Sequence, residues 1–304
     1  MRYEVQTHIR KIAMVFAVMP RNRKADLARA LKEWDGIFPE ALPNTLKNMK
    51  SKLSRTISMY GTWQGCDVLV VGAGKSAIDN LDVIAKWPGK IVCVDRIFSE
   101  IKKRGRTPDL CVSLDCRAPE SFFDGADERD TFALAIHQSA ELIESLALKS
   151  RVTLYSPINV KSKPGKIAIK NPVATGACVA AYPTVGCTAA EMAAFLEPRM
   201  IALVGLDGYY ETKEETGVDD DSLIFTLHGM DGVDRYTIPP FIIQMEWFDE
   251  FPTMYPHIHW VDCTQGLLHG YNAKLNNGYK VQTNIKEMCE LMIEIEESSR
   301  QKTA

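Results

Sequence analysis

The sequence predicts an α/β fold in which a doubly wound, mostly parallel sheet is covered by helices on both faces. Short apolar runs alternate with segments of helical periodicity from residue 67 onward, the pattern of parallel strands joined by crossover helices. The apolar runs lack the polar–apolar alternation of a strand with one solvated face, so both faces of the sheet are expected to be buried. A glycine or a polar residue follows most runs, as expected where strands end at a ligand-binding edge.

Six apolar runs are expected to form the first strands of this sheet, and a seventh forms its last strand. The strands are predicted at Val68–Val71, Ile91–Val94, Leu110–Leu114, Phe132–Ile136, Val152–Tyr155, Ile201–Val204 and Ile258–Val261. Helices are predicted at Ile78–Ile84, Ile97–Arg104, Ala140–Leu148, Thr188–Leu196, Tyr236–Phe251 and Asn284–Ser299. This order of elements gives a Rossmann-like sheet whose ligands bind beyond the carboxyl ends of its strands.

Three parts of the chain differ in pattern. Residues 1–60 are expected to form a helical N-terminal extension, because apolar residues recur at helical spacing between prolines. Residues 61–275 hold the alternating pattern of the α/β domain, and residues 276–304 contain a closing amphipathic helix. Within the extension, residues 44–53 form a basic amphipathic segment, which is either a packed helix with solvated lysines or a wall of the ligand cleft.

The composition argues against several classes of protein. The chain has 304 residues, 25% of them charged, and a net charge of −3, so it lacks the basic field of a nucleic-acid-binding protein. Charges stand where a signal peptide needs an apolar core, and no apolar run approaches the roughly 20 residues of a membrane span. None of the eight cysteines belongs to a C-x-x-C pair, and several lie in apolar runs. We therefore expect no zinc site and a cytoplasmic protein with reduced thiols.

A glycine-containing turn, Gly72-Ala-Gly74-Lys75-Ser76, follows the first predicted strand and leads into a helix. Such a turn lets the backbone approach a phosphate, toward which the N–H groups at the start of the helix point. Ala77 replaces the third glycine of the dinucleotide fingerprint, a variant that the fingerprint permits, and the spacing does not fit a P-loop. The turn therefore predicts a nucleotide phosphate beside it.

Polar residues also stand at the carboxyl ends of the other predicted strands. They are Asp95, Ser113 and Asp115, His137, Ser156, and Asp207, which follows the turn glycine Gly205 after the Ile201–Val204 strand. Because the carboxyl ends of parallel strands meet at one edge of a sheet, these residues are expected to gather around one ligand. The alternative is that each Asp or Ser caps the helix that follows it.

Two further residues are candidates for the chemistry. Thr188 is predicted as the first residue of a helix of small side chains, where it either donates to a phosphate oxygen or lies in tight helix–sheet packing. His228 lies in a glycine-rich turn before the Tyr236–Phe251 helix. A neutral imidazole at this place can take a proton from an attacking hydroxyl group; the alternative is a solvated loop histidine.

These motifs, in this order, resemble a known family. The segments are Val70-Val-Gly-Ala-Gly-Lys-Ser76, Val94-Asp95, Thr107-Pro-Asp-Leu-Cys-Val-Ser-Leu-Asp115, Ile201-Ala-Leu-Val-Gly-Leu-Asp207, His228-Gly, Tyr236-Thr-Ile-Pro-Pro and Asp262-Cys-Thr-Gln-Gly266. They resemble the central domain of the motility-associated factor (Maf) flagellin glycosyltransferases, which the archaeal 6-hydroxymethylpterin diphosphokinase MptE shares. The resemblance covers roughly residues 40–275. The family's first loop usually reads Gly-x-Gly-Pro-Ser, and here Lys75 replaces the proline.

The resemblance implies a transferase. Ser113-Leu-Asp115 is similar to the Maf branch, which implies an inverting glycosyltransferase with a nucleotide-activated donor, such as a cytidine-monophosphate nine-carbon acidic sugar. His228 would then be the general base, as the loop histidine is in similar sialyltransferases, and Asp115 is the second catalytic candidate. The expected nucleotide-binding residues are Gly72, Gly74, Lys75, Ser76, Asp95, Ser113, Thr188, Gly205 and Asp207.

Two alternatives remain open at this point. An MptE-like diphosphokinase would transfer pyrophosphate from ATP to a pterin alcohol, with Mg²⁺ held by Asp95, Asp115 and Asp207. A non-catalytic nucleotide-binding module would use the same edge of the sheet without chemistry. Apart from Mg²⁺ in the diphosphokinase case, no cofactor is firmly implied, and the expected partner is a nucleotide sugar or a nucleoside triphosphate. The acceptor and the oligomeric state are left open by the sequence.

Overall fold

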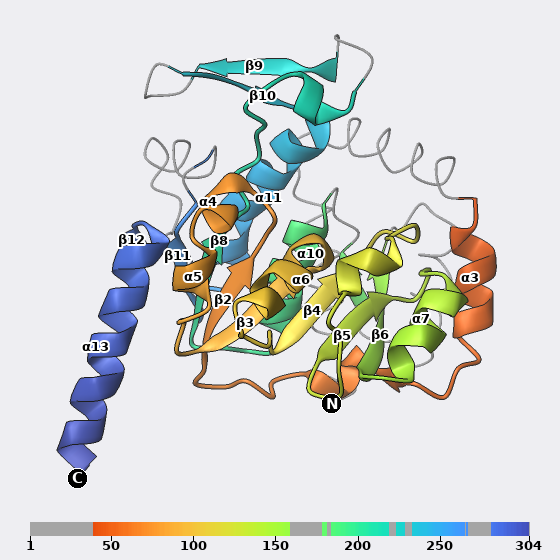
Figure 1. Ribbon diagram of the computed structural model, residues 1–304, viewed down its shortest axis with the longest axis horizontal. Helices are drawn as coiled ribbons and strands as arrows, with labels where there is room; N and C mark the ends of the chain where they lie inside the picture. Colours follow the sequence, from red (N-terminus) through yellow and green to blue (C-terminus); the bar gives the residue numbers. More distant parts are fainter. Residues whose placement is uncertain are drawn as a thin grey trace.

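The computed structural model describes residues 39–158, 178–180, 184–218, 223–228, 233–264, 266 and 281–303. Ten strands of this part of the chain form one sheet in the order β1-β6-β5-β4-β3-β2-β8-β11-β12, with β7 paired to β6 (Figure 1). They are β1 (Ser54–Arg55), β2 (Asp67–Val71), β3 (Lys90–Val94), β4 (Leu110–Ser113), β5 (Thr131–Ala135), β6 (Arg151–Ile158), β7 (Cys178–Ala180), β8 (Met200–Val204), β11 (His259–Asp262) and β12 (Val281–Gln282). All neighbouring strands run parallel, so the predicted doubly wound α/β fold is confirmed.

The strand order reverses at β2. From β2 to β6 the chain adds each new strand on one side, whereas β8 and β11 follow on the other side of β2. Val71 at the end of β2 pairs with Cys93 of β3 and with Val204 of β8, so the three strands end at the same level. In an open α/β sheet such a reversal marks the ligand-binding position, beyond the carboxyl ends of the two strands that diverge from it.

The helices cover the sheet in the positions that the sequence predicts, with shifted ends. They are α3 (Ala41–Asn48), α4 (Lys75–Ile78), α5 (Leu81–Ile84), α6 (Asp95–Lys103), α7 (Ala140–Ala147), α10 (Val185–Phe195), α11 (Pro239–Met254) and α13 (Ile285–Thr303), with short 3₁₀ helices η1 (Thr56–Met59), η2 (Glu120–Phe123) and η3 (Glu214–Thr216). The prediction of one continuous helix over Ile78–Ile84 is wrong. Asn80 leaves the helical conformation (φ −123°), and its side-chain amide donates to Ser76 O at 2.9 Å, which separates α4 from α5.

The core lies on both faces of the central strands. Every residue of β4 and β8 is buried, and β2, β3 and β5 are buried after their first residue. On one face, Phe132 of β5 packs edge-on against Phe98 of α6 and Phe123 of η2, with ring centroids 5.1 and 5.5 Å apart. This burial on both faces explains why the strands read as continuous apolar runs.

The described part of the predicted N-terminal extension contains both a helix and a strand. Residues 1–38 lie outside the described residues. The basic segment forms α3 only as far as Asn48, and α3 packs against α7. The side-chain amide of Asn48 donates to Ile136 O and Gln138 O, both at 2.9 Å. Strand β1, where only helices were predicted, pairs with β6 and so belongs to the sheet. The domain boundaries at residues 60 and 275 stay predictions.

A two-stranded antiparallel hairpin, β9 (Phe225–His228) and β10 (Asp234–Thr237), stands above the sheet in Figure 1. The prediction that a helix begins at Tyr236 is wrong, because Tyr236 exchanges backbone hydrogen bonds with Tyr210 at 2.7 and 2.9 Å. Helix α11 begins at Pro239 instead, since proline is favoured in the first helical turn, where its missing N–H has no intrahelical partner.

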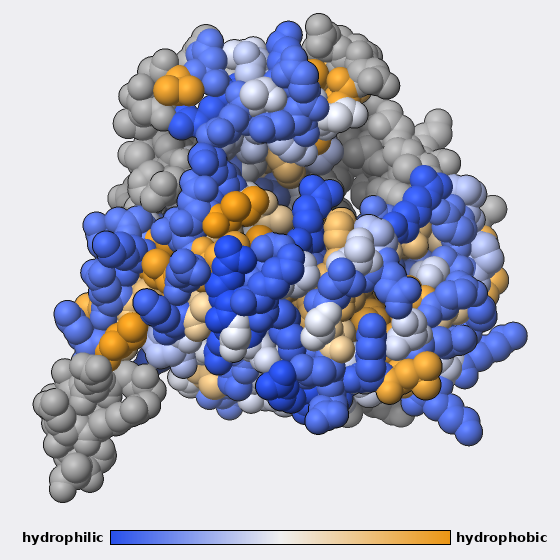
Figure 2. All heavy atoms as spheres, in the orientation of Figure 1, coloured by the Kyte–Doolittle hydropathy of each residue, from blue (hydrophilic) through white to orange (hydrophobic). Residues whose placement is uncertain are grey.

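The C-terminal helix α13 confirms the predicted amphipathic segment. Ile285, Met288 and Met292 are buried, and the Cys289 thiol donates to Val83 O at 3.7 Å, so this face holds the helix against α5. The far end of α13 projects beyond the sheet in Figure 1. Among the described helices, none is both long and apolar enough to cross a membrane. The face shown in Figure 2 is mainly hydrophilic, with hydrophobic side chains in small separate groups.

Candidate functional site

A pocket of about 820 Å³ lies at the carboxyl edge of the sheet, at the reversal of strand order. Its wall includes the residues that follow β2, β3, β4 and β8, together with the start of α10 and the first turn of α11. Seven of the predicted site residues line it: Gly72, Gly74, Lys75, Asp95, Asp115, Gly205 and Asp207. The volume is within the range of ligand-binding pockets. The structure therefore brings together most of the strand-end residues around one cavity.

The floor of the pocket is a close contact between the backbone after β2 and the backbone after β8. Gly74 N donates to Gly205 O at 2.8 Å, and a Cβ atom on Gly72 would lie 2.2 Å from that same carbonyl oxygen. Gly205 has a φ of +69°, and a Cβ atom on it would lie 2.5 Å from the Cβ of Ala77. Glycine at both positions is thus required for the two turns to meet, which leaves main-chain atoms facing the pocket.

Asp207 caps the first turn of α4. Its carboxylate accepts from Ser76 N at 2.8 Å and from the Ser76 hydroxyl at 2.5 Å, and this hydroxyl accepts from Gly205 N at 2.8 Å. Asp207 and Ser76 are both buried. The carboxylate therefore occupies the position at this helix start where the sequence predicted a phosphate. Ser76 does not line the pocket, and a phosphate near α4 would have to bind beside Asp207.

Asp95 is a buried carboxyl group in the pocket wall. One of its oxygens accepts from Arg96 N at 2.7 Å, and the other accepts from the Ser113 hydroxyl at 2.6 Å. Ser113 in turn accepts from the side-chain amide of Gln138 at 2.8 Å. Burial raises the pKa of Asp95, against the opposing effect of these two hydrogen bonds. Ser113 lies behind Asp95 and does not line the pocket, so its predicted contact with the nucleotide would run through Asp95.

Cationic and aromatic side chains form the outer wall of the pocket. Lys75 pairs with Asp79 at 2.8 Å, and this contact raises the pKa of Lys75, so the amine stays charged. Arg96 is exposed and also lines the pocket. The aromatic members of the wall are Phe122, Tyr209, Tyr210 and Phe241. The sequence analysis singled out Lys75 and missed the rest. Arg96 follows Asp95 on α6 but belongs to no motif, and the rings reach the pocket only through the packing of η2, α11 and the segment after β8.

Thr184, and not the predicted Thr188, lies at the start of α10 and lines the pocket. Helix α10 begins at Val185, and the Thr184 hydroxyl accepts from Cys187 N at 3.4 Å as its N-cap. Thr188 lies one turn inside the helix, fully buried, with its hydroxyl donating to Thr184 O at 3.4 Å, so the prediction that the helix begins there is wrong. Thr184 lines the pocket beside Gln244, to which it donates at 2.5 Å.

The two catalytic candidates have different positions. Asp115 is exposed in the pocket wall, and one of its oxygens accepts from Arg117 N at 2.9 Å. His228 is the last residue of β9 and is paired with Asp234. Thr237, at the other end of β10, is tied to the segment after β8 by a hydrogen bond to Gly208 O at 2.7 Å. His228 therefore lies about 10 Å along the hairpin from that attachment, at a rise of roughly 3.4 Å per residue.

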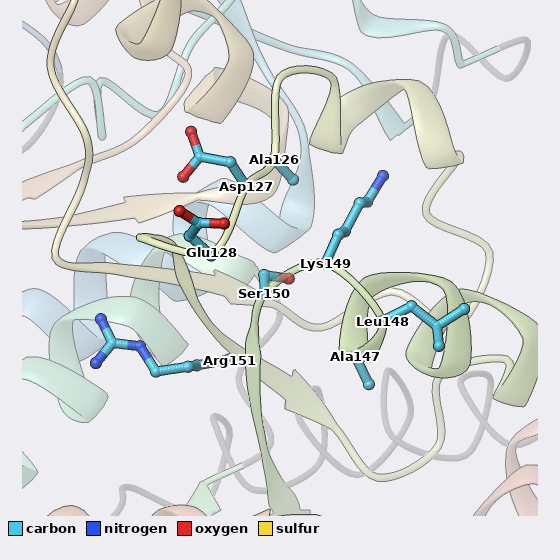
Figure 3. A pocket seen from close by; sticks show the side chains of 8 residues that line it. All are labelled: Ala126, Asp127, Glu128, Ala147, Leu148, Lys149, Ser150 and Arg151. Atoms are coloured by element: carbon cyan, nitrogen blue, oxygen red, sulfur yellow. The ribbon is translucent and has the colours of Figure 1, made fainter.

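A second hollow, of about 590 Å³, lies at the opposite edge of the sheet, where β5 and β6 begin. Figure 3 shows that its charged side chains diverge: Lys149 and Arg151 point away from each other, and the carboxylates of Asp127 and Glu128 do not point toward a common centre. Asp127 is held by Arg129 at 2.6 Å and by Lys102 at 3.0 Å. The arrangement lacks the converging polar groups of a ligand site.

A solved structure confirms the fold. The structure of a Maf glycosyltransferase from Magnetospirillum magneticum AMB-1 superposes with a TM-score of 0.59 and 16% sequence identity. The match covers 75% of this chain and 36% of that protein, so the chain corresponds to only part of the glycosyltransferase. No curated protein matches the sequence.

A family model matches residues 40–213, which is more than half of the chain. This region begins just before α3 and ends after β8, so it contains the glycine turns and all three strand-end aspartates of the pocket. His228 and the hairpin lie beyond it. The chain belongs to the 6-hydroxymethylpterin diphosphokinase MptE-like family.

Proposed function

We propose that the protein is a transferase that binds a nucleotide-activated donor in the pocket at the strand reversal, and that the transferred group is a glycosyl group. The observation that carries the proposal is the meeting of Gly72 and Gly205 beneath a cavity lined by Asp95, Lys75 and Arg96. Main-chain atoms, a carboxyl group and two cations are what a nucleoside phosphate requires of its site.

Each part of the donor has a matching group in the pocket. Asp95, fixed by Ser113 and Arg96 N, is suited to accept the ribose hydroxyls. The side chains of Lys75 and Arg96 supply positive charge for the phosphate, because Asp207 already caps α4. Asp115, exposed on the same wall, is left for the hydroxyls of the transferred group or of the acceptor.

His228 is the proposed general base, on the strength of the resemblance alone. Its place on β9 means that the hairpin must lie over the bound donor for the imidazole to reach an acceptor hydroxyl. A nucleotide phosphate leaves as a stable anion. Transfer therefore requires only that the acceptor is positioned, that one base takes its proton and that the phosphate charge is stabilised.

A second candidate, diphosphoryl transfer from ATP, is favoured by the family match. It needs Mg²⁺, which commonly binds one or two carboxylates together with substrate phosphates. The aspartates of the pocket fit a Mg²⁺ site only in part. The oxygens of Asp95 and of Asp207 already accept hydrogen bonds from protein donors, so Asp115 is the aspartate best placed to hold a metal carried by the nucleotide. Such a metal would offset the phosphate charge during transfer.

Thermal shift measurements with cytidine monophosphate and with ATP, each with and without Mg²⁺, distinguish these functions. The glycosyltransferase hypothesis predicts a rise in Tm with cytidine monophosphate that does not depend on Mg²⁺. A rise with ATP alone, dependent on Mg²⁺, would favour the diphosphokinase instead. Absence of any shift with all four ligand conditions would contradict nucleotide binding at this site.

The variant His228→Ala tests the catalytic base. We expect turnover of a cytidine-monophosphate sugar to fall about 10²- to 10⁴-fold, because general-base catalysis contributes that much, with nucleotide affinity near that of the parent. His257→Ala is the matched control, since His257 is exposed and pairs only loosely with Glu197 at 3.4 Å. Parental turnover in His228→Ala would remove the residue from the mechanism. Nucleotide binding without turnover in the parent would indicate a non-catalytic module.

A further inference from the structure

We propose that Arg96 and Phe122 form the subsite for the nucleobase of the donor, with the base stacked on the guanidinium face that Phe122 leaves open. The inference rests on the proposed function, because it assigns a place to one part of the nucleotide. It adds two residues to the site that the sequence motifs do not include.

The geometry of the pair supports a stacking role. The Cζ atom of Arg96 lies 5.8 Å from the centroid of the Phe122 ring, and both residues line the pocket. The guanidinium therefore lies within cation–π distance of the ring, and Arg96 is exposed. A planar guanidinium held on an aromatic ring is a suitable platform for a third planar group, because it stacks with aromatic faces on both sides.

The surroundings hold this platform in place. Phe122 belongs to η2, and the next residue, Phe123, is buried against Phe132 with ring centroids 5.5 Å apart. On the other side, Arg96 N donates to Asp95, so the backbone at residue 96 is fixed by the proposed ribose ligand. Since the base and the ribose hydroxyls belong to one nucleoside, a ribose at Asp95 leaves the base within reach of the Arg96 side chain.

Two more aromatic residues of the pocket's outer wall, Tyr210 and Phe241, pack against each other. Tyr210 stacks on Phe241 with ring centroids 5.3 Å apart and an interplanar angle of 28°. Two backbone hydrogen bonds to Tyr236, of 2.7 and 2.9 Å, fix the position of Tyr210. Burial raises the pKa of Tyr210, and the positive charge of Arg96 opposes that rise. The pocket therefore offers aromatic surface beyond Phe122 to a bound base.

The main alternative is that Arg96 contacts only the phosphate. Lysine keeps the positive charge but cannot stack as a planar group, so Arg96→Lys separates the two roles. Phe122→Leu removes the aromatic ring and keeps an apolar side chain against the core. Arg104→Lys is the matched control, because Arg104 is the C-cap of the same helix and pairs with Glu100 at 3.0 Å, outside the pocket.

The test is calorimetric titration of the whole protein with cytidine monophosphate, ATP and ribose 5-phosphate, which lacks the base. We expect Arg96→Lys and Phe122→Leu each to weaken nucleotide binding by roughly 5- to 100-fold, the usual effect of losing a base-stacking side chain. Binding of ribose 5-phosphate should be unchanged in these variants, or too weak to detect even in the parent, and Arg104→Lys should behave as the parent. Unchanged Tm values of the free variants show that they are folded.

Each contrary outcome has a separate meaning. If the parent protein binds neither nucleotide, the proposed function fails. If the parent binds a nucleotide and both variants bind it with the affinity of the parent, only the proposal of the base subsite is wrong. If Arg96→Lys binds as the parent while Arg96→Ala loses both nucleotide and ribose 5-phosphate, Arg96 is a phosphate ligand and the stacking inference is overturned.

Discussion

At the scale of single residues, the site is built from polar groups that satisfy one another before any ligand binds. Ser76, predicted to contact a phosphate, instead joins Asp207 to Gly205 N. Ser113 joins Asp95 to Gln138 in the same way. The strand-end residues could be identified from the sequence because each comes shortly after an apolar run that predicts a strand. Which of them face the pocket and which lie behind it depends on hydrogen bonds between residues more than 100 positions apart, as for Ser76 and Asp207, and no local pattern encodes these.

Replacement of Ser76 by alanine tests the cap of α4. The variant loses the hydroxyl that donates to Asp207 and accepts from Gly205 N, and leaves that buried N–H without its acceptor. We expect the free energy of unfolding to fall by about 1–3 kcal/mol, the usual range for a buried hydrogen bond whose partner stays behind. Urea denaturation followed by circular dichroism measures it. Ser58→Ala, at an exposed position, is the control, and equal stability of both variants would contradict the cap.

His137 makes stability depend on pH. It is buried, its Nε2 lies 2.6 Å from Leu114 O, and burial lowers its pKa from 6.5 to about 4. The unfolded chain therefore binds a proton between pH 6.5 and about 4 that the folded protein excludes, and stability falls as the pH falls through this window. At 1.36 kcal/mol per pKa unit, the loss attributable to His137 is about 3 kcal/mol.

The variant His137→Gln isolates this contribution, because glutamine can still donate to Leu114 O but does not titrate. We expect the difference in unfolding free energy between parent and variant to be constant above about pH 7. Below that pH it should shift in favour of the variant, by roughly 3 kcal/mol at pH 4. Urea titrations at a series of pH values measure the difference. A difference independent of pH would show that His137 is not held neutral.

At the scale of elements, the strands were the most predictable part of the fold and the helix ends the least. Continuous apolar runs identified the central strands because both faces are buried. The starts of α10 and α11 were misplaced because they depend on Thr184 as N-cap and on the pairing of Tyr236 with Tyr210, and these features involve single side chains or distant backbone. Strand β1 has only two residues, Ser54 and Arg55, too few for any periodicity.

Helix α3 is predicted to act as a structural clamp on the segment that follows β5. Replacing Asn48 by alanine removes both hydrogen bonds to the carbonyls of Ile136 and Gln138. We expect a loss of about 1–3 kcal/mol, since the carbonyl oxygens stay buried. Lys47→Ala, on the same helix, removes only an exposed ion pair with Glu141 and should cost less than about 0.5 kcal/mol. Chemical denaturation compares the two, and an equal effect of both would contradict the clamp.

At the scale of the whole molecule, the reversal of strand order determines where ligands bind. The alternating sequence pattern predicted a doubly wound sheet. It did not predict that β2 and β8 are neighbours, because that pairing arises only when the chain returns to the other side of β2. That return brings Gly72 against Gly205, residues separated by more than 130 positions, and creates the pocket floor. The aromatic wall could not be predicted, because Phe122, Tyr210 and Phe241 come from three separate segments that meet only in the folded protein.

The crystal structure of the protein in complex with the nucleotide that raises its Tm most is the most direct test of nucleotide binding at the strand reversal. We predict density for the ribose hydroxyls at the Asp95 carboxyl group and for the phosphate above the Gly72–Gly205 contact, within reach of Lys75. Density for the nucleotide at the opposite edge of the sheet, or on the hairpin away from the pocket, would contradict the account.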